Sequence, residues 1–207
     1  APILPDPDFV PHVVDCIRAS GIAARLLLVS FRHDLLQQAK ALMPELRIGV
    51  LTLGDLLSMM LPPPVIWQDL GLVNSMDEPL DEENCPALKK QVGMVSSVIS
   101  DKLTLIAALY PQMSVRQILA TLSAQADPAA YVRTLGFPVE LVSCEYHTAF
   151  ANPEVVNQLH DAGCKAAFWT VNTEDVVRSL VPLGPDCFVT DRPDVIREWI
   201  EKAQAEM

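Results

Sequence analysis

Several common catalytic and ligand-binding signatures are absent from this chain of 207 residues. It contains no Gly-x-Gly-x-x-Gly, no Gly-x-x-x-x-Gly-Lys-Ser/Thr, no Gly-x-Ser-x-Gly and no His-Glu-x-x-His. These patterns build the phosphate-binding loops, nucleophile turns and zinc sites of large enzyme classes. The sequence therefore gives no support to a dinucleotide-binding, P-loop, serine-hydrolase or zincin function.

Positive charge is also scarce. The chain has 15 Lys and Arg against 26 Asp and Glu, a formal net charge of −11. Nucleic acids and anionic membranes attract basic surfaces, so we expect no nucleic-acid partner and no docking to anionic membranes. The longest apolar stretch, around residues 103–110, is too short to cross a bilayer, and we predict no membrane span.

The five cysteines are scattered, and none belongs to a Cys-x-x-Cys pair. We therefore expect reduced thiols in a cytoplasmic protein. The N-terminus, Ala1, is not a methionine, and no basic segment or apolar signal core follows it. We expect the sequence to begin inside a longer one.

The residues that are abundant indicate an α/β fold. Half of the chain is apolar and only 6% is aromatic, which is typical of an aliphatic core of helices packed on a buried parallel sheet. Helix-start signals at Asn152, Thr173 and Pro193 alternate with short apolar runs, the pattern of βαβ units. The predicted strands are 25–31, 47–53, 139–144, 166–171 and 186–190.

Residues 54–138 interrupt this rhythm. A crossover between parallel strands needs roughly 20 to 30 residues, and this segment is far longer. Apolar positions at helical spacing predict one helix, Ser114 and Gln117 form a capping-box signature for another, and Asp127 precedes a third. The first helix has its apolar stripe at Leu88, Val92, Val95, Ile99, Leu103 and Ile106. We interpret the segment as a helical insertion, which is either a lid over a site, or an inert elaboration or oligomer contact.

Two short segments carry chemically active side chains. Residues 144–147, Cys-Glu-Tyr-His, could contribute to a metal site, but a buried Cys beside a hydrogen-bonded His is the favoured interpretation because no second ligand pair is visible. His33 and Asp34 follow the first predicted strand, where Asp34 suits the first turn of a helix.

Three further segments, taken in this order, resemble the glycerophosphodiester phosphodiesterase family. The first is LLVSF at 27–31 with MPELRIGVL at 43–51, the second is AGCKAAFWTVN at 162–172, and the third is LGPDCFVTDRP at 183–193. The resemblance implies a partial TIM-type (β/α)8 barrel, about strands 4 to 8, as a single incomplete-barrel domain over 1–207 that contains the 54–138 helical insertion.

The resemblance also implies an activity and a set of site residues. The family hydrolyses a small-molecule glycerophosphodiester to an alcohol and glycerol 3-phosphate with a divalent cation, Mg or Ca, in lipid and glycerol metabolism. By this resemblance Trp169 should line the pocket near the glycerol moiety, with Ser30 and Phe31 at the same strand ends. Asn172 should shape its loop, and Thr190 and Asp191 should cap the last helix.

The family's His-Arg-Gly, Glu-Asn-Thr, Glu-x-Asp and strand-end His-Asp motifs have no counterpart at the required places. His33 and Asp34 share the letters of one motif but follow the wrong strand. We therefore assign no catalytic residue and no metal ligand, and we expect a truncated, inactive chain. The alternatives are a non-catalytic relative that binds phosphodiesters or a protein partner, and an unrelated α/β protein. The two open edges of a partial barrel, with exposed Leu28 and Val189, predict a homo-oligomer or an open, marginal sheet.

Overall fold

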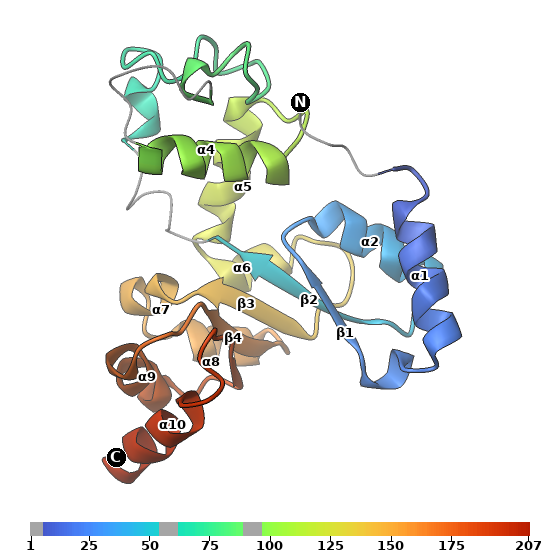
Figure 1. Ribbon diagram of the computed structural model, residues 1–207, viewed down its shortest axis with the longest axis vertical. Helices are drawn as coiled ribbons and strands as arrows, with labels where there is room; N and C mark the ends of the chain where they lie inside the picture. Colours follow the sequence, from blue (N-terminus) through green and yellow to red (C-terminus); the bar gives the residue numbers. More distant parts are fainter. Residues whose placement is uncertain (1–5, 54–61, 89–96) are drawn as a thin grey trace.

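A computed structural model of the chain describes residues 6–53, 62–88 and 97–207 (Figure 1). Its strands form one parallel sheet in the order β1-β2-β3-β4-β5. They are β1 (Leu27–Ser30), β2 (Arg47–Thr52), β3 (Leu141–Glu145), β4 (Lys165–Trp169) and β5 (Cys187–Phe188). Each strand overlaps one of the five apolar runs, so the prediction of an α/β fold with a parallel sheet is confirmed.

Helices cover one face of this sheet and build the larger core with it. They are α1 (Phe9–Ser20), α2 (His33–Leu42), α7 (His147–Ala151), α8 (Val155–Asp161), α9 (Glu174–Leu180) and α10 (Ile196–Ala205). Ile48, Val142 and Phe168 point from the strands into this core. Because side chains alternate along a strand, the positions between them, such as Gly49 and Ser143, face the other side of the sheet.

The segment between β2 and β3 builds a second core beyond the strand ends (Figure 1). The described elements of this segment are η2 (Pro64–Ile66), η3 (Pro86–Leu88), α4 (Ser97–Leu109), α5 (Val115–Gln125) and α6 (Pro128–Val132). Of these, α6 packs into the larger core through Ala129 and Val132. Trp67, Leu72, Leu103, Ile106 and Leu122 are among the buried members of the second core. The predicted capping box of Ser114 and Gln117 is present at the start of α5, and Asp127 accepts a hydrogen bond from the Ala130 amide at the start of α6. Val92 and Val95, at the start of the first predicted helix, lie outside the described residues.

Two helices begin later than their sequence signals predict. The Asn152 side chain accepts the Glu154 amide in a local turn, and α8 begins only at Val155. Near the C-terminus the Thr190 hydroxyl accepts the Arg192 amide, so the chain closes a turn before α10 begins at Ile196 rather than at Pro193. In both places a polar side chain satisfies a backbone donor locally and delays the helix. Short 3-10 turns, η1 (Ala23–Arg25) and η4 (Val181–Leu183), complete the order.

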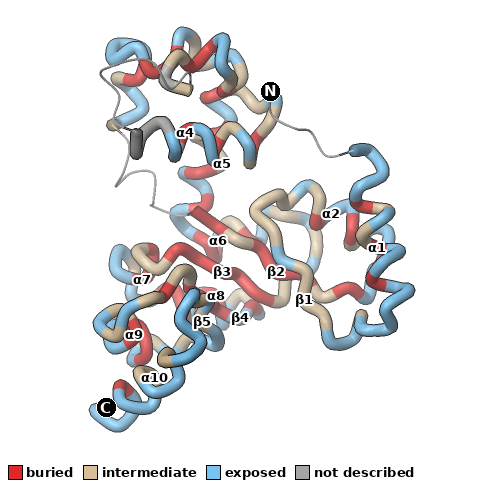
Figure 2. The backbone as a smooth tube through the Cα atoms, viewed as in Figure 1, coloured by how far each residue is buried: buried red, intermediate tan, exposed pale blue. Residues whose placement is uncertain are grey.

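The outer strands β1 and β5 leave the sheet with two edges. Figure 2 shows that β2 and β3 are mostly buried whereas β1 is less covered. Val29 is 43% exposed and Val189 is 45% exposed. The prediction for Leu28 is wrong, because this side chain points to the helical face and packs against the larger core. Among the helices within the described ranges, none is long and apolar enough to cross a membrane.

Candidate functional site

The carboxyl ends of the strands bring together two aromatic side chains from strands that are not neighbours. Phe31 follows β1 and Trp169 ends β4, yet their ring centroids lie 5.3 Å apart with an interplanar angle of 87°. Three strand spacings in a flat sheet amount to roughly 14 Å. The strand ends therefore curl toward one another, as in a barrel wall. In (β/α)8 barrels this edge carries the active site.

The three residues predicted to bind substrate have different surroundings. The indole N–H of Trp169 donates to the Ser143 carbonyl oxygen at 3.0 Å, which fixes the ring plane. Phe31 and Trp169 both pack against the second core, so this core lies over the pair. The Ser30 hydroxyl accepts the Arg32 amide at 3.0 Å. The structure thus brings Phe31 and Trp169 together, while the role of all three residues in binding stays a prediction.

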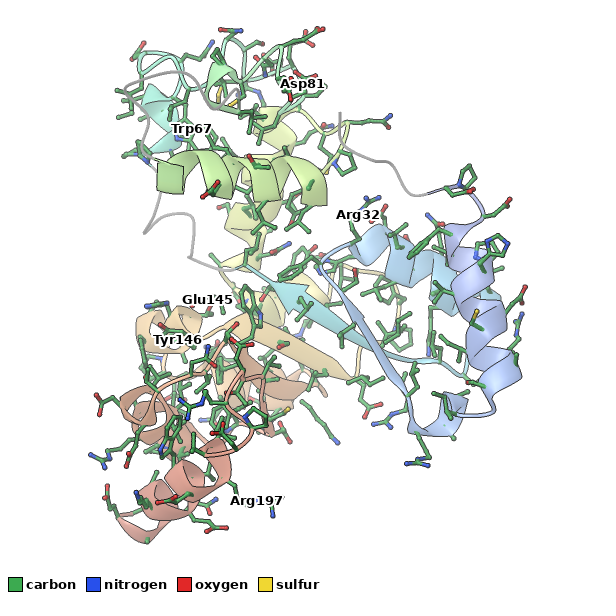
Figure 3. All side chains as sticks on the ribbon, viewed as in Figure 1. Arg32, Trp67, Asp81, Glu145, Tyr146 and Arg197 are labelled. Carbon is green, nitrogen blue, oxygen red and sulfur yellow. The ribbon has the colours of Figure 1, made fainter. Side chains whose placement is uncertain are left out.

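A carboxylate and an imidazole meet at the end of β3. Glu145, 4% exposed, accepts the His147 backbone amide at 2.9 Å and faces His147 Nδ1 at 2.8 Å. Both oxygens of one carboxylate therefore hold one histidine. Glu145 lies beside Trp169 in the sheet register, and the Tyr146 amide donates to the Trp169 carbonyl oxygen at 3.1 Å. Figure 3 shows Glu145 and Tyr146 at this end of the sheet.

Two aromatic rings contact His147, and the hydroxyl of Ser143 lies on the same face of the sheet as Glu145. The imidazole stacks on Tyr146, with centroids 4.2 Å apart, and meets Phe150 edge-on at 5.9 Å. Two residues before Glu145 on β3, the buried Ser143 hydroxyl has no hydrogen-bond partner within the described part of the chain. The sheet alternation places Ser143 and Glu145 on the same face.

His33 and Asp34 do not form a catalytic pair. Asp34 receives two hydrogen bonds from the Arg32 guanidinium, at 2.8 and 2.6 Å, which lower the pKa of its carboxyl group. His33 lies between the Tyr131 hydroxyl, 2.7 Å from Nδ1, and the Leu51 carbonyl oxygen, 2.9 Å from Nε2. Burial lowers the pKa of His33 and favours the neutral ring. The interpretation of Asp34 as a first-turn acid of α2 agrees with the structure.

The loops after β4 and β5 are joined by side-chain hydrogen bonds. Asn172 donates to Asp191 at 2.8 Å and accepts from the Asp191 amide at 2.9 Å and from the Thr190 hydroxyl at 3.2 Å. Asn172 therefore shapes its loop as predicted. Thr190 and Asp191 do not cap α10, because the helix begins five residues after Asp191.

Cys144 is a structural residue. Its side chain faces the helical core, and burial raises the pKa of its thiol to about 12, so it stays protonated and unreactive. Across residues 6–53, 62–88 and 97–207 no three His, Cys, Asp or Glu side chains gather as metal ligands. These residues do not by themselves fit a divalent cation.

A hollow of about 460 Å³ lies at the amino ends of the strands, away from the aromatic pair at their carboxyl ends. Val139 and Cys164, which line it, precede β3 and β4. Arg133 and Phe137 also line it. In a barrel the amino ends of the strands serve stability rather than chemistry.

The pair of Glu145 and His147 was only half visible in the sequence. The sequence interpretation favoured a buried Cys144 beside a hydrogen-bonded His147, and both features are present, but it did not name Glu145 as the partner of the imidazole. No sequence pattern indicated the buried hydrogen bonds of Gln125. Its buried amide donates to the Tyr110 hydroxyl at 3.0 Å and accepts the Leu53 amide at 3.2 Å.

A curled parallel sheet with helices on one face, and with polar and aromatic groups at the carboxyl ends of its strands, is the arrangement of a β/α barrel wall. A model of the glycerophosphoryl diester phosphodiesterase family matches residues 73–195. The chain belongs to this family. A search among curated proteins returned no match.

Solved structures agree on the fold. The chain is similar to a glycerophosphoryl diester phosphodiesterase structure from Silicibacter pomeroyi, with 19% identity and a TM-score of 0.53, over 95% of this chain and 45% of that one. A glycerophosphodiester phosphodiesterase from Parabacteroides distasonis gives 13% identity and a TM-score of 0.50, over 95% of this chain and 52% of that one. The chain thus spans about half the length of these structures.

Proposed function

We propose that the chain forms the part of a glycerophosphodiester phosphodiesterase that contacts the glycerol moiety, and that the activity is hydrolysis to an alcohol and glycerol 3-phosphate. The observation that carries the proposal is the contact of Phe31 and Trp169 across the curled strand ends in a chain of this family. Two aromatic faces that meet at the carboxyl edge of a barrel wall suit the carbon skeleton of a small substrate.

The same proposal assigns the strands and the insertion. The sheet corresponds to about strands 4 to 8 of a (β/α)8 barrel, within one domain over 1–207. The 54–138 segment acts as a lid, supported by the packing of its core against Phe31 and Trp169. We further propose a cytoplasmic protein of lipid and glycerol metabolism.

The catalytic groups are proposed to lie outside these 207 residues. The histidine and carboxylate motifs of the glycerophosphodiester phosphodiesterase family are missing from the sequence. The described residues also do not fit the divalent cation that the family uses. Cleavage of a phosphodiester anion needs charge neutralisation and a proton for the leaving oxygen. The isolated chain should therefore be inactive.

The test compares two proteins on one substrate. Glycerol 3-phosphate release from glycerophosphocholine is measured with Mg²⁺, Ca²⁺ or a chelator for the 207-residue chain and for the chain extended by the coding sequence upstream of Ala1. We expect activity only in the extended protein, restored by a divalent cation after chelation. Activity of the short chain would contradict the assignment of the catalytic groups.

The second candidate is a non-catalytic relative that binds phosphodiesters or a protein through the 54–138 segment. The observation that favours it is the same packing over Phe31 and Trp169, which closes the strand ends. An extended protein that binds glycerophosphocholine but releases no glycerol 3-phosphate under any cation would support this candidate and refute the first.

A further inference from the structure

A phosphodiester is an anion and this chain is acidic. A site at the carboxyl ends of the strands therefore needs a positively charged group to bind it. The described loops that follow the strands offer few. Arg32 donates two hydrogen bonds to Asp34, at 2.8 and 2.6 Å. Arg192 donates two hydrogen bonds to Asp194, each at 3.1 Å. Both guanidinium groups are thereby committed to a carboxylate.

The two histidines at the carboxyl ends of the strands, His33 and His147, differ in how many ring nitrogens have a hydrogen-bond partner. Both ring nitrogens of His33 have partners, the Tyr131 hydroxyl and the Leu51 carbonyl oxygen. His147 has a partner at Nδ1 only, and within the described chain Nε2 makes no hydrogen bond. The His147 side chain is 31% exposed, so a ligand can reach it.

Glu145 prepares this imidazole for an anion. Its buried carboxylate accepts the backbone N–H and lies 2.8 Å from Nδ1, which fixes the proton on Nδ1 and the orientation of the ring. Because the carboxylate holds Nδ1, the other ring nitrogen, Nε2, points away from it. The stacked Tyr146 ring holds the imidazole on its other side.

The pair is also in the right place. Glu145 and Trp169 are register partners on neighbouring strands, and the loop that carries His147 is tied to β4 by the Tyr146 amide. Nε2 of His147 and the aromatic pair therefore lie at the same end of the sheet. A glycerophosphoryl group has the matching parts, a carbon skeleton and an anionic head.

We propose that His147, oriented by Glu145 and carrying a proton on each ring nitrogen when the anion binds, donates Nε2–H to the phosphate group of the substrate, an inference that rests on the proposed function. Glu145 is a positioning residue in this arrangement. The ligand class is a glycerophosphoryl anion, and the Phe31–Trp169 pair is its apolar counterpart.

The experiment measures binding to the 207-residue chain by calorimetry, with sn-glycerol 3-phosphate, inorganic phosphate and glycerol as probes. We expect sn-glycerol 3-phosphate to bind more tightly than either of the others. His147→Gln should weaken this binding by tenfold or more, the order of magnitude of a charge-assisted hydrogen bond. Glu145→Gln should weaken it in the same direction.

His160 supplies the matched control. It pairs with Asp186 at 2.8 Å, the same distance as in the Glu145–His147 pair, but Asp186 bonds to Ala166 at the amino end of the sheet. His160→Gln should leave the affinity unchanged. In the 15N-histidine spectrum of the unmodified chain, the His147 ring signals should move on titration and those of His160 should not, a readout that needs no variant.

Three outcomes would overturn the inference: equal affinity in His147→Gln, equal binding of inorganic phosphate and sn-glycerol 3-phosphate, or no binding by the unmodified chain. None of them bears on hydrolysis by the extended protein, so the proposed function is judged separately. Circular dichroism melts of each variant show whether a lost affinity comes from a lost fold.

Discussion

At the scale of single residues, Gly49 of β2 leaves no room for a side chain beside Val29 of β1. A Cβ added there would lie 2.7 Å from Val29 Cγ1, whereas the next atoms, on Leu141, are at an ordinary 3.4 Å. Gly49→Ala therefore strains one contact. We expect it to lower the free energy of unfolding by about 1–2 kcal/mol, the usual cost of overpacking, as measured by urea denaturation.

A second substitution isolates the cause. Val29→Ala removes the clashing methyl and, because Val29 is 43% exposed on an edge strand, should itself cost less than about 1 kcal/mol. The double variant should then be about as stable as Val29→Ala alone. Simple additivity of the two changes would show that Val29 is not what excludes a side chain at position 49.

His33 gives the fold a dependence on pH. Burial lowers the pKa of His33 in the folded state, although the bond to the Leu51 carbonyl oxygen and the charge of Asp34 oppose this. The unfolded chain therefore takes up the proton first, and stability is lost as the pH falls below about 6.5. The slope is at most about 1.4 kcal/mol per pH unit.

Urea denaturation between about pH 7 and pH 5 checks this expectation. His33→Gln should flatten the slope in this window, whatever it does to the stability at neutral pH. The carboxyl groups with lowered pKa, such as that of Asp34, lose their contribution only below about pH 4, outside the window. An unchanged slope in the variant would assign the pH dependence to another group.

At the scale of the elements, a buried polar network joins the segment between β2 and β3 to the sheet. Gln125 of α5 donates to Tyr110, which follows α4, and accepts the amide of Leu53, which follows β2. Burial raises the pKa of Tyr110 to about 12, so its hydroxyl stays protonated. Gln125→Leu leaves two buried groups unpaired and should cost about 2–4 kcal/mol.

Gln38 of α2, which is exposed, provides the comparison. Gln38→Leu should change the free energy of unfolding by no more than about 0.5 kcal/mol. Hydrogen exchange would localise the effect of Gln125→Leu, with faster exchange at the Leu53 amide. Equal stabilities of the two variants would mean that the network does not hold the insertion in place.

The sheet was predictable from the sequence because a buried parallel strand leaves a short apolar run between polar residues. The helix starts near Asn152 and Pro193 were misplaced because local side-chain turns compete with helix capping there. The junction through Gln125 was not predictable, since its bond to Leu53 spans 72 positions. A contact of this kind leaves no local pattern.

The site was predictable to the same extent. The motif around Trp169 placed the indole at a strand end, but only the curl of the sheet brings Phe31 to it. The two-residue spacing of Glu145 and His147 was visible in the sequence. Their bonds depend on the turn after β3, which the sequence did not specify.

At the scale of the whole molecule, the sheet formed by the described residues has two open sides, whereas a (β/α)8 barrel is closed. Five strands in the order β1 to β5 leave one edge at β1 and one at β5. The chain covers 45% to 52% of the solved structures that it resembles. The groups that would complete the barrel and its chemistry are therefore proposed to come from other residues, and the described edges are where they would pair.

Until that pairing occurs, the isolated chain should self-associate through the same edges. Val29 in β1 and Val189 directly after β5 expose apolar side chains at the two outer strands of the sheet. The backbone groups on the open side of an outer strand can form hydrogen bonds with a strand of another chain. We expect sedimentation velocity to show oligomers that grow with concentration, and a single Lys at an edge, in Val29→Lys or Val189→Lys, to shift the chain toward monomer. Val65→Lys is the control, because Val65 is 84% exposed but lies in the insertion, away from both edges. A monodisperse monomer with a cooperative melt would contradict the prediction and show that open edges alone do not drive this fold to associate.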